Sequence, residues 1–150
     1  MAEEQQEQTL GVVAQYIKDL SFENVTPVTQ ISAATEQPNI DVQLKVDAEK
    51  AKQADLYNIR LLIEITAKLK DTTLFIAELN YCGEFIVKGF DKELMEPILY
   101  IECPRLLFPF ARSIISNAVN EGGFPPLFLA PVDFAGLYQQ QLEARNQTKQ

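Results

Sequence analysis

The chain has 150 residues, 47% of them hydrophobic and 23% charged, a balance typical of one soluble globular domain. Its net charge of −8 argues against nucleic acid as a partner, because nucleic-acid binders carry a basic surface. The sequence contains no histidine, which excludes Ser-His and Cys-His catalytic pairs and histidine-based metal sites.

Residues 1–9, MAEEQQEQT, are polar and unpatterned, so we expect a disordered N-terminal tail. This acidic start is the reverse of a signal peptide, and no apolar run is long enough to span a bilayer. We therefore expect a cytoplasmic protein without stable membrane insertion. In that compartment Cys82 and Cys103 are expected to be reduced and structural.

Alternating apolar and polar residues predict the first strand within residues 12–23. Leu20 and Phe22 point one way, while Asp19, Ser21 and Glu23 point the other. Residues 24–38 form a connection that is long for a compact domain, so they are expected to have a role of their own.

The clearest strand covers residues 40–47, where apolar and polar residues alternate without a fault. A third strand is predicted over residues 56–69, followed by a tight turn at Lys70-Asp71 and an antiparallel partner over residues 72–81. Gly83 is expected to form a bulge or bend. One face of this sheet is apolar, and the other mixes charges with exposed aliphatics, namely Leu62, Leu74 and Ile76.

The C-terminal third predicts helices. Residues 91–101 suggest a short helix or irregular turn around Pro97, and residues 105–121 form the principal helix, ended by Gly122 and Gly123. The segment FPPLFLAPV, residues 124–132, is a stiff apolar strap. Asp133 is a plausible N-cap for a helix from Phe134 to about Arg145, and residues 146–150 form a frayed tail.

Strands followed by helices predict the α+β class, a four-stranded antiparallel sheet with helices packed on one face. Carboxylate pairs such as Glu49 and Asp55 exist, but nothing marks them as acid–base partners, and there is no phosphate-binding loop. A small enzyme on this scaffold is therefore the less favoured interpretation.

Two segments resemble signatures of the SecB family of bacterial protein-export chaperones. They are YIKDLSFE (Tyr16–Glu23) and CPRLLFPFARSIISNAVNEGGFPPLFLAPVDF (Cys103–Phe134). The resemblance covers about residues 12 to 142, and residues 10–145 are expected to form one SecB-like domain. The chain departs from the family at Ile17, where threonine is common, and at Cys82, where a glycine is common.

The resemblance implies a homotetramer, a dimer of dimers, that holds unfolded precursor proteins and passes them to the translocation ATPase SecA. Family members hydrolyse nothing and need no cofactor or metal; the zinc in the encounter belongs to the basic tail of SecA. A related use within the family, a chaperone dedicated to a toxin–antitoxin pair, remains an alternative.

The resemblance also assigns residues to three surfaces. The SecA contact maps to Asp19, Glu23, Ile76 and Glu78, and the strand pattern independently puts each pair on one face. The inward face and principal helix are expected to support assembly through Ala77, Leu79, Tyr81, Ala111, Ile114, Ile115 and Ala118. For Ala77, Leu79 and Tyr81, a place in the core of the monomer is the alternative, and the two interpretations overlap. The client groove is expected at Ile40, Val42, Leu44, Phe134, Leu137 and Tyr138, although the pattern alone favours core over groove for each of them.

Overall fold

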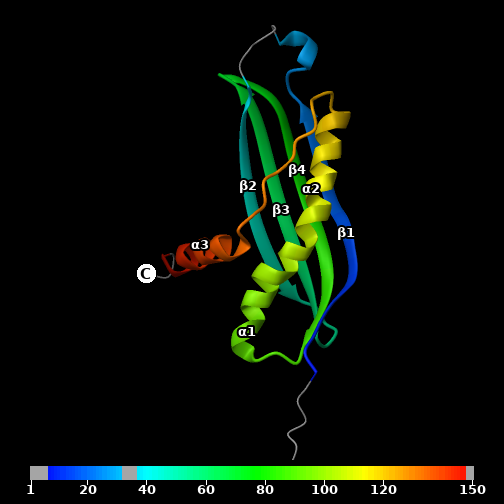
Figure 1. Cartoon of the computed structure of the whole chain (residues 1–150), viewed down its shortest axis with the longest axis vertical. Helices are drawn as coiled ribbons and strands as arrows, with labels where there is room; N and C mark the ends of the chain where they lie inside the picture. Colours follow the sequence, from blue (N-terminus) through cyan, green and yellow to red (C-terminus); the bar gives the residue numbers. More distant parts are fainter. Residues whose placement is uncertain (1–6, 32–36, 148–150) are drawn as a thin grey trace, which may run out of the picture.

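The computed structural model describes residues 7–31 and 37–147. Its four strands form one antiparallel sheet in the order β1-β4-β3-β2, with helices on one face (Figure 1). This confirms the predicted α+β class and the four-stranded antiparallel sheet. The strands are β1 (Thr9–Asn24), β2 (Asn39–Lys50), β3 (Leu56–Leu69) and β4 (Thr72–Lys88).

The predicted tails and the long connection fall only partly within the described residues. Residues 1–6, 32–36 and 148–150 lie outside them. Thr9, which was predicted to be in the N-terminal tail, already begins β1, and Val28–Gln30 form a single 3₁₀ turn, η1.

β3 and β4 form the predicted hairpin, and Lys70 takes the left-handed conformation that its tight turn requires, with φ at 55°. Lys68 pairs with Thr73, but Ala67 pairs with Phe75. Leu74 is therefore an extra residue, a β-bulge, that shifts the register of the rest of the hairpin. It is buried, so the prediction that it is exposed beside Ile76 is wrong.

Gly83 stays inside β4, opposite Gln15 of β1 and Ile59 of β3, so the predicted bend is also wrong. A Cβ atom at this position would lie 2.6 Å from the Phe85 ring and 2.8 Å from Cδ2 of Leu107. The glycine is needed because the helix passes so close to the strand.

A nearly continuous helical run crosses the inner face of the sheet (Figure 1). It comprises α1 (Lys92–Pro97), a π-helical turn η2 (Ile98–Glu102) and α2 (Cys103–Glu121). The predicted principal helix and the helical segment around Pro97 are thus both present. Gly123, with φ at 89°, ends α2 as predicted, and the amide of Phe124 donates to the carbonyl of Val119 at 3.2 Å.

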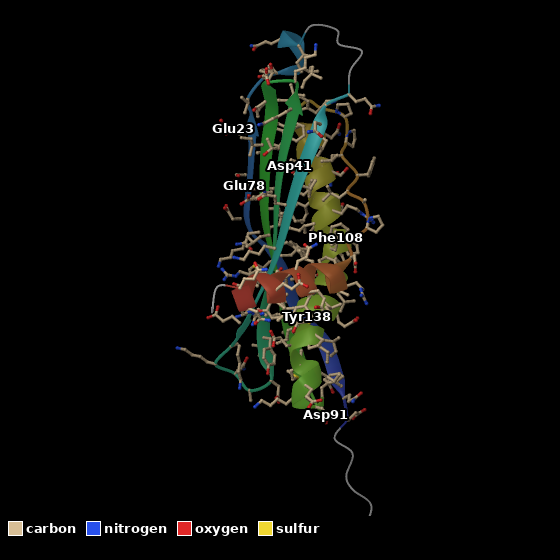
Figure 2. The ribbon with its side chains drawn as sticks, turned by 90° about the vertical axis from the view of Figure 1, so that its left-hand side faces the viewer. Glu23, Asp41, Glu78, Asp91, Phe108 and Tyr138 are labelled. Atoms are coloured by element: carbon tan, nitrogen blue, oxygen red, sulfur yellow. The ribbon has the colours of Figure 1, made fainter. Side chains whose placement is uncertain are left out.

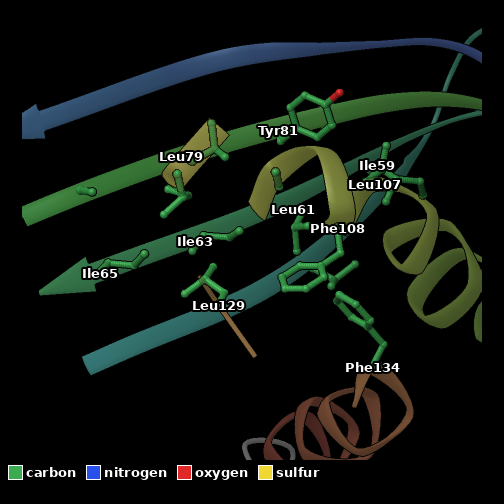
Figure 3. Close-up of a cluster of buried hydrophobic side chains, with 14 of the residues drawn as sticks. Ile59, Leu61, Ile63, Ile65, Leu79, Tyr81, Leu107, Phe108, Leu129 and Phe134 are labelled. Atoms are coloured by element: carbon green, nitrogen blue, oxygen red, sulfur yellow. The ribbon is translucent and has the colours of Figure 1, made fainter. Parts of the chain in front are cut away.

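The core lies between the inner face of the sheet and α2 (Figure 3). Ile59, Leu61 and Ile63 of β3 have no exposed surface and pack against the face of α2 that carries Leu107 and Ile115. Each such aliphatic side chain contributes about 1.5–3 kcal/mol by leaving water. This burial fixes α2 to the sheet and leaves the opposite sheet face without a covering layer.

The strap, residues 124–132, runs back over the sheet to α3 (Phe134–Gln147) (Figure 1). Phe124 and Leu129 anchor it in the core, while Phe128 is 77% exposed. Asp133 caps α3 as predicted, because its Oδ1 accepts a hydrogen bond from the Gly136 amide at 3.1 Å.

Candidate functional site: the bare sheet face and the two sheet edges

The four residues predicted for the SecA contact all lie on the bare outer face of the sheet, away from the helices. Glu23 of β1 is directly opposite Ile76 of β4, and Asp19 is opposite Asn80. Glu78 lies one cross-strand row from Ile76, and Figure 2 shows Glu23 and Glu78 on the side of the sheet opposite the helices. The structure therefore brings the four together.

The sequence analysis missed a fourth acidic residue in this group. Glu64 of β3 lies directly opposite Glu78, so two like charges form a cross-strand pair. Such a pair is destabilising unless a cation or partner compensates for it. Within residues 7–31 and 37–147, none of Asp19, Glu23, Glu64 and Glu78 forms an ion pair. We call these four residues together with Ile76 the acidic patch.

Toward the other end of the strands, the same face carries an ion pair instead of unpaired carboxylates. Asp47 of β2 lies directly opposite Arg60 of β3 and binds its guanidinium, and this hydrogen bond raises the pKa of Arg60. Beside them, burial raises the pKa of the Cys82 thiol, although Lys18 and Arg60 act in the opposite direction. Cys82 is therefore a neutral, buried thiol under Tyr16, its cross-strand partner.

One edge of the sheet, strand β1, exposes apolar side chains on both faces. Two β-bulges, one between Val12 and Ala14 and one between Ile17 and Asp19, interrupt its pairing with β4. The exposed large apolar residues of this edge are Val12, Val13, Tyr16, Ile17 and Leu20. On the neighbouring outer side of α2, Leu106 and Phe110 are also about half exposed. Nothing within the described residues covers these side chains.

The residues predicted for the oligomer interface are mostly inside the protomer. Five of the seven are buried in its own core: Ala77, Leu79, Tyr81, Ala111 and Ile115. The physical reason is that α2 packs directly on these inward positions, so they present no surface to a second copy. The other two, Ile114 and Ala118, are half-buried and keep part of their surface exposed.

The opposite edge, strand β2, has a regular alternation and carries half of the predicted client groove. Ile40 and Leu44 are half-buried on the inner face, and Val42 is more exposed. Gln141 of α3 reaches this edge: its Oε1 accepts from the Val46 amide at 3.3 Å, and its Nε2 donates to the Val46 carbonyl at 3.2 Å.

The α3 residues of the predicted groove divide into two groups. Leu137 and Tyr138 are half-buried, and Tyr138 stacks on Tyr100 of η2. Phe134 is 2% exposed and packs edge-on against Phe108, so it belongs to the core and cannot line a groove. Its ring is buried because Phe134 begins α3 directly after the strap, and at this point α3 lies against α2.

A cleft of about 520 Å³ lies between α2 and the strap. Arg112 and Asn117 line it from α2, and the exposed ring of Phe128 forms part of its strap side. The groove elements therefore offer an aromatic ring and polar side chains as well as the β2 edge.

No helix within the described residues is long and apolar enough to cross a membrane. Those residues also hold no group of three or more Cys, Asp or Glu side chains placed to bind a metal ion.

Residues 3–145 match the family model described as "Preprotein translocase subunit SecB". The "Protein-export protein SecB" of Rhodopseudomonas palustris (strain BisB5) is 47% identical over 141 residues, which cover 94% of this chain and 89% of the relative. The protein of the same name from Xanthobacter autotrophicus is 45% identical over 139 residues, covering 93% and 88%.

A solved structure has a similar fold. It is the SecB-like chaperone of Mycobacterium tuberculosis in complex with a ChAD peptide from the HigA1 antitoxin, with a TM-score of 0.68. The two chains are 11% identical, and the match covers 82% of this chain and 90% of that one.

Proposed function

The chain belongs to the SecB family of protein-export chaperones, and we propose that it holds unfolded precursor proteins in the cytoplasm and delivers them to SecA. The family match over residues 3–145 carries this proposal. A chaperone of this kind works by binding rather than by catalysing a reaction. The bare outer face and the two open edges of the sheet are surfaces suited to binding.

The client site of the proposal is the inner side of the β2 edge together with α3 and the strap. An unfolded chain offers backbone amides and scattered apolar side chains, and an open strand edge binds both without reading a sequence. Val42 and Phe128 supply exposed apolar surface near exposed backbone. Because the contacts are many and weak, a single alanine substitution there should cost little affinity.

The SecA site of the proposal is the acidic patch. Its uncompensated carboxylates attract a basic tail and speed the encounter, while Ile76 adds apolar contact at the centre. Glu64 joins the predicted Asp19, Glu23 and Glu78 because it faces Glu78 across the strands. The zinc that folds the tail is carried by SecA in this proposal.

The proposed assembly is a homotetramer built as a dimer of dimers. The β1 edge supports it, because an open edge with exposed apolar side chains on both faces is a liability in a monomer. The outer side of α2, with Leu106 and Phe110 beside Ile114 and Ala118, offers the second surface.

The alternative of a chaperone dedicated to a toxin–antitoxin pair is less favoured. The solved structure bound to an antitoxin peptide shares the fold at 11% identity, whereas relatives named for protein export are 45–48% identical.

The test of the proposal is a refolding assay with a reduced precursor protein that still carries its signal sequence. The chain should delay its refolding, migrate with it as a complex, and release it when SecA and ATP are added. Refolding at an unchanged rate, with no complex detected, would rule out the chaperone function.

A further inference from the structure

One stripe of side chains holds α3 to the rest of the protomer. Phe134 packs on Phe108 with ring centroids 5.8 Å apart, and Tyr138 stacks on Tyr100 at 5.6 Å. Further along, Arg145 pairs with Glu96 at 3.1 Å. The contacts recur every three or four residues, so they share one helix face. The members of this stripe are Phe134, Tyr138, Gln141 and Arg145.

Gln141 is the member of the stripe that binds the sheet edge, and it does so as a peptide group would. In an antiparallel sheet, two opposite residues can exchange both of their backbone hydrogen bonds. The side-chain amide of Gln141 makes the same two bonds with Val46, one to its amide and one to its carbonyl. Figure 2 shows α3 crossing the edge of the sheet.

The Gln141 bonds also reveal which backbone groups of β2 face outward. Because the N–H and C=O of Val46 point away from β3, residues at intervals of two along the strand point the same way. On one side of Val46 the outward positions are Ile40, Val42 and Leu44, and on the other side they are Ala48 and Lys50. Gln141 therefore divides a longer edge into two parts.

The contact is weak enough to be displaced. Each neutral hydrogen bond contributes about 1 kcal/mol net, and Phe134 is the one residue of α3 that is fully buried. The rest of α3 is therefore held mainly by partly exposed side chains, the type of element that opens locally at low cost. The backbone of an incoming peptide could make the same two hydrogen bonds with Val46 that Gln141 makes.

We propose that Gln141 is a removable cap on the β2 edge, which stops a short extended segment at Leu44 and gives way to a longer unfolded one. The inference rests on the proposed client site. In the capped state a bound segment pairs with Ile40, Val42 and Leu44. With α3 displaced, the pairing extends past Val46 toward Lys50, so the cap makes binding favour long unfolded segments over short exposed strands.

The test uses two alternating Val/Lys peptides, one of about five residues to match the edge from Ile40 to Leu44 and one of about eleven to match the edge from Ile40 to Lys50. In Gln141→Ala the long peptide should bind about fivefold more tightly than to the wild type, because it no longer competes with two hydrogen bonds. The short peptide should bind equally to both. Alanine keeps the helix, since it is a strong helix former.

Gln140→Ala is the matched control, because Gln140 is exposed on the neighbouring position of the same helix. It should change neither affinity. A version of the long peptide N-methylated at every residue has no backbone N–H to donate along either edge and should lose the gain in Gln141→Ala. Hydrogen exchange of the Val46 amide in the free protein should be faster in Gln141→Ala than in Gln140→Ala.

The outcomes separate this inference from the proposed client site. If the wild type binds both peptides and Gln141→Ala binds them no differently from Gln140→Ala, the cap is wrong and the client site stands. If Val46 exchange accelerates but no form binds either peptide, the β2 edge is not a client site and the gating role is overturned with it.

Discussion

The two edge strands of this sheet have opposite surface chemistry. β1 is interrupted by two bulges and exposes apolar residues on both faces, including Val13 and Ile17. β2 pairs with β3 without a shift, alternates regularly, and has its outward backbone closed at Val46 by the Gln141 side chain. Apolar surface on both faces favours a permanent partner, whereas a regular edge with a weak cap favours a transient one.

This difference would allow one small domain both to assemble and to bind clients, as we propose. If both edges were like β1, unfolded chains and other subunits would compete for the same surface. The acidic patch lies between the edges on the bare face, so a SecA tail bound there leaves both edges free. A change to one of these three regions should therefore leave the other two intact.

The largest effect is expected from a charge on the β1 edge. Ile17→Lys should prevent tetramer formation, because it places an ammonium group in the apolar surface that would be buried between subunits. Light scattering should report a smaller species, while the circular dichroism of the folded domain changes little, since Ile17 is exposed in the single protomer. Ile86→Lys, on the outer face away from the edge, is the control and should remain tetrameric.

A proline at Val42 should weaken client binding about tenfold without changing the assembly. The N–H of Val42 faces outward, so proline removes a donor for the client and spares the pairing with β3, a position where edge strands tolerate proline. Affinity for a permanently unfolded protein, measured by fluorescence anisotropy, checks this. Gln43→Pro is the contrast, because its N–H faces β3 and its loss should destabilise the fold.

Reversing the charge at Glu78 should weaken SecA binding and slightly stabilise the fold. Glu78→Lys replaces a repulsive pair with Glu64 by an attractive one, worth up to about 1 kcal/mol. Calorimetry with the zinc-loaded SecA tail should show lower affinity, and denaturant unfolding should shift upward. Glu49 is an exposed carboxylate on β2 outside the patch, so Glu49→Lys should leave SecA affinity nearly unchanged. An equal loss of affinity in Glu49→Lys would mean that Glu78→Lys acts only through the net charge of the protein.

The smallest expected effect is a pH dependence of folding stability. It arises in the core, so it should not distinguish the two edges. Burial, and to a lesser extent Glu102, raises the pKa of Cys103 from 9.0 to about 12. Above 9.0 the unfolded chain loses this proton and the folded chain keeps it, so stability falls with rising pH by up to about 1.4 kcal/mol per unit. Cys103→Ala should unfold with a shallower pH slope between pH 9.0 and about 12; an unchanged slope would remove Cys103 as its cause.

The fold and the outer face could be predicted from sequence because alternation is a local signal. The pattern of Asp19 and Glu23 on one strand, and of Ile76 and Glu78 on another, fixes the face without knowledge of the neighbours. Glu64 was missed because its position opposite Glu78 depends on the bulge at Leu74. Nothing in the alternation of that strand marks the inserted residue.

The edges could not be predicted because strand order is not local. β1 pairs with β4 rather than with its neighbour in sequence, β2, and this leaves both early strands at edges. A helical stripe likewise does not say what covers it, so Leu79 and Ile115 were assigned to an interface although α2 buries them within the protomer. Gln141 gave no signal, since nothing in the sequence distinguishes it from Gln139 and Gln140 in the same run of glutamines.

Hydrogen–deuterium exchange on the protein in its assembled state in solution, with and without a permanently unfolded protein, tests the assignment of the two edges most directly. The account predicts that β2 between Ile40 and Leu44 gains protection when the unfolded chain binds, while β1 is already protected and does not change. Protection gained on β1 with β2 unchanged would contradict it, because the unfolded chain would then occupy the edge assigned to self-assembly.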